Sequence, residues 1–283
     1  MMSDKASVLE KRPWVIKKAN CSLHLSDDAI DYADGVFFLK ETGELCAYII
    51  PDQTVFPEVL VLPKEVRILP SSFRFGYKGM KKLVIKGDID AHDFSFQKCA
   101  LEEIVFEGNM IYPSYSYGMA NEAFRSSEQL RSVVLPKGIY GITSYAFFDC
   151  PALTHVELPD QLKHIGRRAF SNCSSLTEVF VPDGVRKIEK EAFYCCSSLK
   201  RISMPASLEQ LQGNVFQGCY KLQTIEFRGT KAQWDAVKKG HEEEDGSFFQ
   251  DFSRVGYDYA YSSPKKISWN PTNKEYQMIF RED

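Results

Sequence analysis

A period of 23 residues dominates the central part of this chain. The segments AFFDCPALTHVELP, AFSNCSSLTEVFVP and AFYCCSSLKRISMP begin at residues 146, 169 and 192. A fixed period of roughly 20 to 50 residues is typical of solenoids, in which each repeat forms one turn and stacks on its neighbours. Because a single turn cannot bury its own apolar side chains, the core must run through the whole stack.

Within each repeat, the pattern Leu-x-x-Val-x-Leu alternates apolar and variable residues, which predicts a short strand with one buried face. A proline closes four of these strands, since proline has no N–H to donate to a strand ladder. The run RRAFSNC is predicted to form one helical turn that carries Phe170 and Cys173 into the core. The recurring phenylalanines are Phe124, Phe147, Phe170, Phe193 and Phe216, and the prolines are Pro136, Pro159, Pro182 and Pro205.

These features predict an α/β repeat solenoid. We expect a right-handed, leucine-rich-repeat-type stack of about seven 23-residue turns with parallel strands, capped at both ends. Residues 1–58 are predicted as an N-terminal cap region with a β-hairpin, residues 59–228 as the solenoid, and residues 229–283 as a C-terminal helix and aromatic capping segment. Phe96 and Phe124 are 28 residues apart, so that turn carries an insertion.

Single cysteines follow the same period. They stand at Cys150, Cys173, Cys196 and Cys219, and Cys99 has the same place after Phe96. The chain has no C-x-x-C pair of the kind that holds zinc. We therefore expect reduced, buried cysteines that act as small apolar core residues, with disulfides or a redox role as the alternative. No metal or other cofactor is predicted.

The repeat resembles that of the BspA-like leucine-rich repeat family, whose unit reads roughly L-x-x-V-x-I-P-x-x-V-x-x-I-G-x-x-A-F-x-x-C. The likeness is strong over residues 123–228 and partial over residues 59–122. The ending FRGTKAQWDAVKKG is similar to the usual close of that family, and Thr230 in it is expected to cap a helix whose Trp234 and Val237 face the last turn. The resemblance implies a surface or secreted bacterial protein that binds host proteins or takes part in adhesion.

Charge and hydropathy narrow the class of protein. The net charge is −3 and the pI about 6.0, which does not favour nucleic-acid binding. The longest apolar runs are only a few residues, so membrane insertion is not expected, and residues 1–20 lack the apolar stretch of a signal peptide. We expect a cytoplasmic location for the chain as written, whereas the family resemblance implies the cell surface or secretion if a signal was removed.

Sequence motifs of catalysis are missing. The chain has no G-x-S-x-G, no phosphate-binding loop and no H-E-x-x-H. The outward positions of the strands remain as the candidate functional surface. One outward column holds three valines in succession and then a phenylalanine two turns on, and such an apolar strip suggests an interface. Alternatively, the valines serve only strand propensity, or a cap or the insertion covers them.

A tyrosine-rich insertion is the second candidate surface, because tyrosine suits the recognition of proteins and sugars. It could also pack back on the solenoid. The candidate binding residues are Val84, Val105, Val134, His155, Glu157, Phe180, Arg201, Tyr112, Tyr115 and Tyr117.

The pattern as a whole predicts a non-enzymatic binding or scaffold module that presents a concave strand surface to a protein or glycan partner. A monomer is favoured. The alternatives are a structural element that assembles into a homo-oligomer and an enzyme whose site lies in the flanks.

Overall fold

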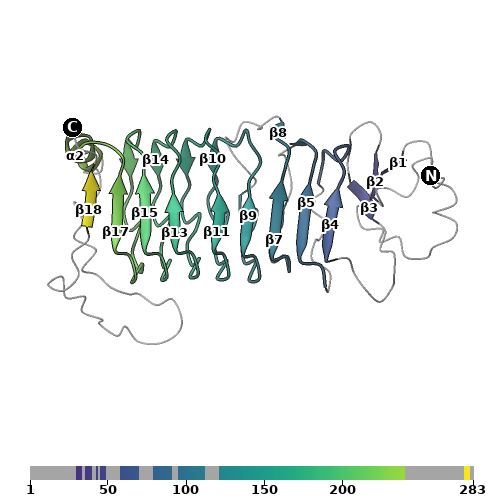
Figure 1. Cartoon of the computed structure of the whole chain (residues 1–283), viewed down its shortest axis with the longest axis horizontal. Coiled ribbons are helices and arrows are strands. Elements are labelled where there is room, and N and C mark those ends of the chain that lie inside the picture. Colours follow the sequence, from purple (N-terminus) through teal and green to yellow (C-terminus); the bar gives the residue numbers. More distant parts are fainter. Residues whose placement is uncertain are drawn as a thin grey trace.

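The computed structural model describes residues 30–33, 36–39, 43, 45–48, 58–69, 79–90, 95–111, 121–239 and 277–280. Most of them form an elongated stack of turns (Figure 1). Each turn contributes one strand to a row that we call the front sheet. The front strands are β4 (Val59–Leu62), β5 (Lys82–Ile85), β7 (Glu103–Phe106), β9 (Ser132–Val134), β11 (His155–Glu157), β13 (Glu178–Phe180), β15 (Arg201–Met204) and β17 (Thr224–Phe227).

The front strands pair in parallel, and residues one repeat apart lie opposite each other. Val133 pairs with Val156, for example, and Ile202 pairs with Ile225. The inward side chains of this sheet enter one continuous core. The predicted parallel-strand solenoid is therefore confirmed.

Two-residue strands form a second, narrower row on the other side of each turn. They pair in parallel in the order β10-β12-β14-β16, and β6 pairs with β8 in the same way. This row carries the second buried apolar position of the repeat, which includes Ile142, Ile165 and Ile188. The strands are β6 (Ile89–Asp90), β8 (Met110–Ile111), β10 (Gly141–Ile142), β12 (His164–Ile165), β14 (Lys187–Ile188) and β16 (Gln210–Leu211).

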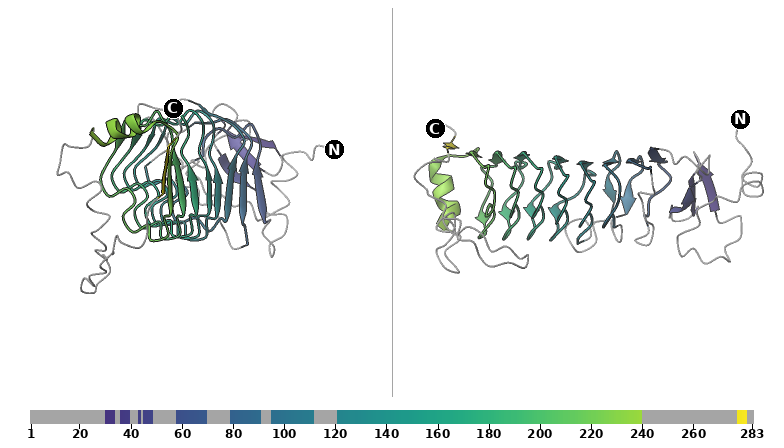
Figure 2. Two further views of the ribbon diagram at one scale, coloured as in Figure 1. Left: turned by 60° about the vertical axis from the view of Figure 1, so that its left-hand side comes forward. Right: turned by 90° about the horizontal axis from the view of Figure 1, so that it is seen from below.

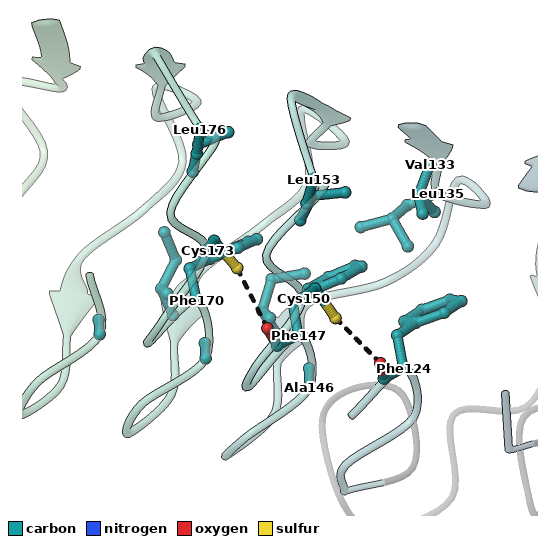
Figure 3. Close-up of a cluster of buried hydrophobic side chains, with 14 of the residues drawn as sticks. Phe124, Val133, Leu135, Ala146, Phe147, Cys150, Leu153, Phe170, Cys173 and Leu176 are labelled. Carbon is teal, nitrogen blue, oxygen red and sulfur yellow. Dashed lines mark hydrogen bonds between the residues drawn. The ribbon is translucent and has the colours of Figure 1, made fainter. Parts of the chain in front are cut away.

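The phenylalanine column forms an uninterrupted stack of rings from Phe96 to Phe216. Successive ring centroids are 4.7 to 6.1 Å apart, and successive ring planes lie within 16° of parallel. Figure 3 shows three of these rings, Phe124, Phe147 and Phe170, one behind the other. Each ring thus contacts the same residue of the neighbouring turn.

The segment around each phenylalanine is a turn with left-handed residues rather than the predicted helical turn. Residues two positions before and after the ring have positive φ, as at Arg168 (52°) and Asn172 (64°) around Phe170. Alternate N–H groups consequently point along the stack, and those of Arg168, Phe170 and Asn172 donate to carbonyls of the next turn. A helical turn would direct these donors back into its own turn, so the ladder between turns prevails.

The periodic cysteines are buried and free, as predicted. Four of them are more than small apolar residues, however, because the thiols of Cys150, Cys173, Cys196 and Cys219 each donate to the carbonyl of the phenylalanine one turn earlier. The Cys99 thiol instead bonds the Ser127 hydroxyl. The Cys150 and Cys173 thiols reach the Phe124 and Phe147 carbonyls at 3.1 Å (Figure 3). Ser127 takes the same position in its turn and donates to the Phe96 carbonyl at 2.8 Å. The column therefore requires a small hydrogen-bond donor. Burial also raises the pKa of the Cys150 thiol, to about 12.

The ends of the stack differ from its repeats. In the N-terminal part, β2 (Val36–Leu39) pairs antiparallel with β1 (Ile30–Ala33) and with β3 (Leu45–Tyr48). The pairing of β2 with β3 corresponds to the hairpin that the sequence predicted there. The proposed region boundaries and the capping role of the flanks stay predictions.

At the C-terminal end, helix α2 (Lys231–Lys239) lies beyond the last turn (Figure 2). The predicted N-cap is confirmed, because the Thr230 hydroxyl accepts from the Gln233 N–H and the Gln233 side chain accepts from the Thr230 N–H. Trp234 and Val237 are buried, and the centroids of the Trp234 and Phe227 rings are 5.3 Å apart. A further strand, β18 (Gln277–Phe280), pairs in parallel with β17, and the sequence did not reveal it.

Deleting one ring from the stack should be costly. We expect Phe170→Ala to lower the free energy of unfolding by about 3–5 kcal/mol, the usual range for truncating a buried aromatic residue. Phe180→Ala is the matched control, since Phe180 is exposed and should cost less than about 1 kcal/mol. Urea denaturation measures both values, and equal losses would contradict the assignment of the column to the core.

The donor requirement of the cysteine column can be tested at Cys173. Cys173→Ser keeps a donor, and Ser127 shows that a hydroxyl fits this position. Cys173→Ala removes the bond to the Phe147 carbonyl, so we expect it to be less stable than the serine variant by about 1 kcal/mol. Chemical denaturation of the pair gives the difference, and an alanine variant at least as stable as the serine variant would contradict it.

Glycine is required where the backbones of two turns approach closely. A Cβ at Gly108 would lie 2.1 Å from the Gly87 carbonyl oxygen, whereas a Cβ at Gly213 would meet nothing within 4 Å. We expect Gly108→Ala to cost about 1–3 kcal/mol through overpacking, and the matched control Gly213→Ala to cost less than about 1 kcal/mol. Thermal melts of the two variants would contradict this account if the two melting temperatures were equal.

Candidate functional site

The front face is the surface that the outward side chains of the front sheet form. The stack is nearly straight in Figures 1 and 2, so we describe this face by its strands rather than as a concave surface. Register aligns one outward column across four strands, with Val61 opposite Val84, Val84 opposite Val105, and Val105 opposite Val134. The predicted valine strip therefore exists and includes Val61 in addition.

The strip is less exposed than its pattern suggested. Val84 is buried, with 9% of its surface exposed, and it is not part of the main core. Its neighbours Val61 and Val105 lie opposite it on both sides, and side chains one strand apart in a sheet cover each other. The expectation that Val84 is exposed is wrong, whereas Val105 and Val134 are half-buried.

The face becomes polar from β11 onward. Val134 lies opposite Glu157, which is exposed, and His155 on the same strand is also exposed. Arg201 on β15 binds Glu226 on β17 at 2.8 Å. This hydrogen bond lowers the pKa of the Glu226 carboxyl. The structure thus brings together Val105, Val134, Glu157 and Arg201 on one face, as the sequence predicted.

Phe180 is the most prominent apolar residue of this face, with 62% of its surface exposed. The Arg228 guanidinium lies over its ring, 4.1 Å from the centroid. Arg228 is held by Asp183 at 2.7 Å, by the Val181 carbonyl at 2.6 Å and by the Ser203 hydroxyl at 2.7 Å. One side of an exposed ring is therefore supported by a fixed cation, a favourable arrangement for a binding residue.

The front sheet is interrupted between β11 and β13. One sheet consists of β4, β5, β7, β9 and β11, and another of β13, β15, β17 and β18. No strand pairing joins β11 to β13 in the part of the chain that the structure describes. The phenylalanine stack and the short strands continue across this point. The ring centroids of Phe147 and Phe170 are 5.1 Å apart, and β12 pairs with β14. The turns therefore separate only at the front.

Apolar side chains that the repeat should bury become accessible at this interruption. Val156 and Val179, which face the core, are only partly buried, and so is Leu158. Their equivalents in neighbouring turns, such as Val133 and Ile202, are fully buried. We call the space between β11 and β13 the front opening. Nothing in the repeat pattern distinguishes these turns from their neighbours, so sequence reasoning missed it.

The structure does not test the predicted tyrosine surface, and it adds one residue that the sequence analysis missed. Tyr112, Tyr115 and Tyr117 lie outside the described residues. Arg228 was missed altogether, because it lies 45 residues from Asp183 and only the stacking of the turns brings the two together. Within the described residues, no helix is long and apolar enough to cross a membrane, and no cluster of metal-ligating side chains is found.

The repeats match a known family. Residues 117–236 correspond to the BspA type leucine rich repeat region, in six copies. No curated protein matches the chain.

Several solved structures are similar to this chain at low sequence identity. A protein from Bacteroides ovatus is 25% identical with a TM-score of 0.43, over 72% of this chain and 47% of that protein, so the chain spans about half of its length. The T. pallidum leucine-rich repeat protein is 18% identical with a TM-score of 0.42, over 83% of this chain and 96% of that protein. The pneumococcal vaccine antigen PcpA is 17% identical with a TM-score of 0.38, over 65% of each chain. From its repeats and the family match, the region over residues 117–236 belongs to the BspA-type leucine-rich repeat family.

Proposed function

We propose that the chain is a non-enzymatic binding module whose front face contacts a partner protein. The observation that carries this proposal is Phe180 on β13, a largely exposed aromatic residue held against Arg228. The core does not need this ring, whereas the phenylalanines of the stacked column from Phe96 to Phe216 are buried. A rigid surface with an exposed aromatic anchor binds without a large loss of conformational entropy.

The repeat family supports a binding or scaffold role in general, and neither a partner nor an activity follows from it for this chain. A glycan is the second class of partner, since an aromatic ring can also stack on a sugar. Adhesion, contact with host proteins and a surface or secreted location remain part of the proposal through the family resemblance. Self-assembly into a homo-oligomer is the alternative that light scattering would detect.

The proposal predicts that two substitutions on the front face weaken partner capture and leave folding intact. Truncating an aromatic anchor typically costs at least about 2 kcal/mol of binding free energy, so Phe180→Ala should reduce capture strongly. Val134→Asp places a charge in the half-buried valine strip and should act in the same direction. Tyr140→Ala, an exposed aromatic residue beside β10, is the control.

The measurement is quantitative capture of proteins from native-cell and host extracts by the wild type and the three variants, with melting temperatures recorded for each. Capture that does not change in Val134→Asp and Phe180→Ala would place the site elsewhere. Loss of folding in both variants would mean that the inward and outward faces are exchanged.

A further inference from the structure

We propose that the front face between β9 and β13 binds an extended segment of a partner protein that carries a lysine or arginine among aliphatic residues. The basic group binds Glu157, and its aliphatic stem lies between Val134 and the ring of Phe180. This inference rests on the proposed function and names the chemistry of the partner at the same surface.

Three outward residues in consecutive turns define this subsite. Val134 and Glu157 lie directly opposite each other on β9 and β11. Phe180 holds the same repeat position on β13, one turn after Glu157. The Glu157 carboxylate therefore has an aliphatic side chain opposite it on β9 and, across the front opening, an exposed aromatic ring at the same repeat position of the next turn. This combination suits the long side chains of lysine and arginine, which are apolar along the stem and charged at the tip.

The Glu157 carboxylate is exposed on the front face. Three carboxylates on or beside the front face have cationic partners on a neighbouring strand or at its start: Glu103 binds Lys82 at 2.7 Å, Glu102 binds Arg131 at 3.2 Å, and Glu226 binds Arg201. The exposed Glu178 on β13 has no such partner among the described residues. For Glu157, the described part of the chain provides neither an ion pair nor a side-chain hydrogen bond. A basic group from a partner would supply the missing counter-charge, and such complementarity favours specific binding.

The Phe180 ring already accepts a guanidinium, that of Arg228. Arg228 comes from the turn of β17 and also binds Ser203 on β15, so it approaches the ring from the C-terminal side of the stack. The side toward Glu157 is therefore the part of the ring that stays open. A second cation on that side would gain both the ring and the carboxylate.

The front opening provides the apolar contacts for the rest of the segment. In an extended segment, side chains two residues apart point to the same side. An aliphatic side chain two positions from the basic residue can therefore contact Val156, Leu158 and Val179, whose apolar surface is partly accessible there. Strands β11 and β13 do not pair with each other, so this surface is free of the ladder that closes the neighbouring turns.

Fluorescence anisotropy with labelled synthetic peptides tests the proposal on the full chain. The probes are short peptides of alternating valine and threonine that differ only in their central residue, which is arginine, lysine, glutamine or glutamate. We expect the arginine and lysine peptides to bind about tenfold more tightly than the glutamine peptide, a usual size for one exposed charge pair with an aromatic contact. The glutamate peptide should bind most weakly, and added salt should reduce the differences.

Substitutions locate the effect. Glu157→Gln should abolish the preference for basic peptides, and Glu157→Arg should reverse it in favour of the glutamate peptide. Glu128→Gln removes the same charge from another exposed carboxylate, in the turn after Phe124, and should leave the preference unchanged. Phe180→Leu should reduce binding of the basic peptides while Glu157 still selects them.

Each other result overturns the proposal. Equal binding of all four peptides that is lost in Phe180→Ala would leave the front face as the binding surface and would reject its selection of basic segments. A preference for basic peptides that Glu157→Gln does not change would place the acidic contact elsewhere. Lack of binding by every peptide would reject extended basic segments as ligands, while the capture experiment would still decide whether the front face binds a partner.

Discussion

The contact between equivalent residues of successive turns is the constraint on which the rest of this structure depends. Each phenylalanine ring packs on the ring of the next turn, and the Ser127 hydroxyl and the Cys150 and Cys173 thiols each donate to the carbonyl of the phenylalanine one turn earlier. These contacts are satisfied only when every turn presents the same side chains at the same height. The 23-residue period is the sequence expression of that requirement.

The constraint tolerates changes of length outside the stacking positions. Lys82 pairs with Glu103, 21 positions later, and Glu103 pairs with Ser132, 29 positions later, yet the strands remain in one sheet. Phe96 still stacks on Phe124 although 28 positions separate them. What the fold conserves is therefore the contact between turns, and the number of residues between two contacts can vary where the chain leaves the stack.

The same constraint explains how the sheet can open at the front without dividing the molecule. Three contacts continue across the interruption between β11 and β13. They are the stacking of Phe147 on Phe170, the hydrogen bond from the Cys173 thiol to the Phe147 carbonyl, and the pairing of the short strands β12 and β14. The two halves of the front sheet are thus held by the core behind them. Where the strand pairing is lost, Val156 and Val179 are only partly buried.

The alternation within each repeat determined which residues are core and which are outward, because burial on one face of a strand follows directly from a period of two. On this basis the sequence predicted the stack, the buried cysteines and the gathering of Val105, Val134, Glu157 and Phe180 on one face. The N-cap at Thr230 was predicted separately, from the ending FRGTKAQWDAVKKG. It did not predict how far each outward residue is exposed. The burial of Val84, the support of Phe180 by Arg228 and the opening between β11 and β13 all depend on contacts between turns. A repeat pattern describes one turn and assigns all turns the same environment, so only the tertiary structure could decide where neighbouring turns differ.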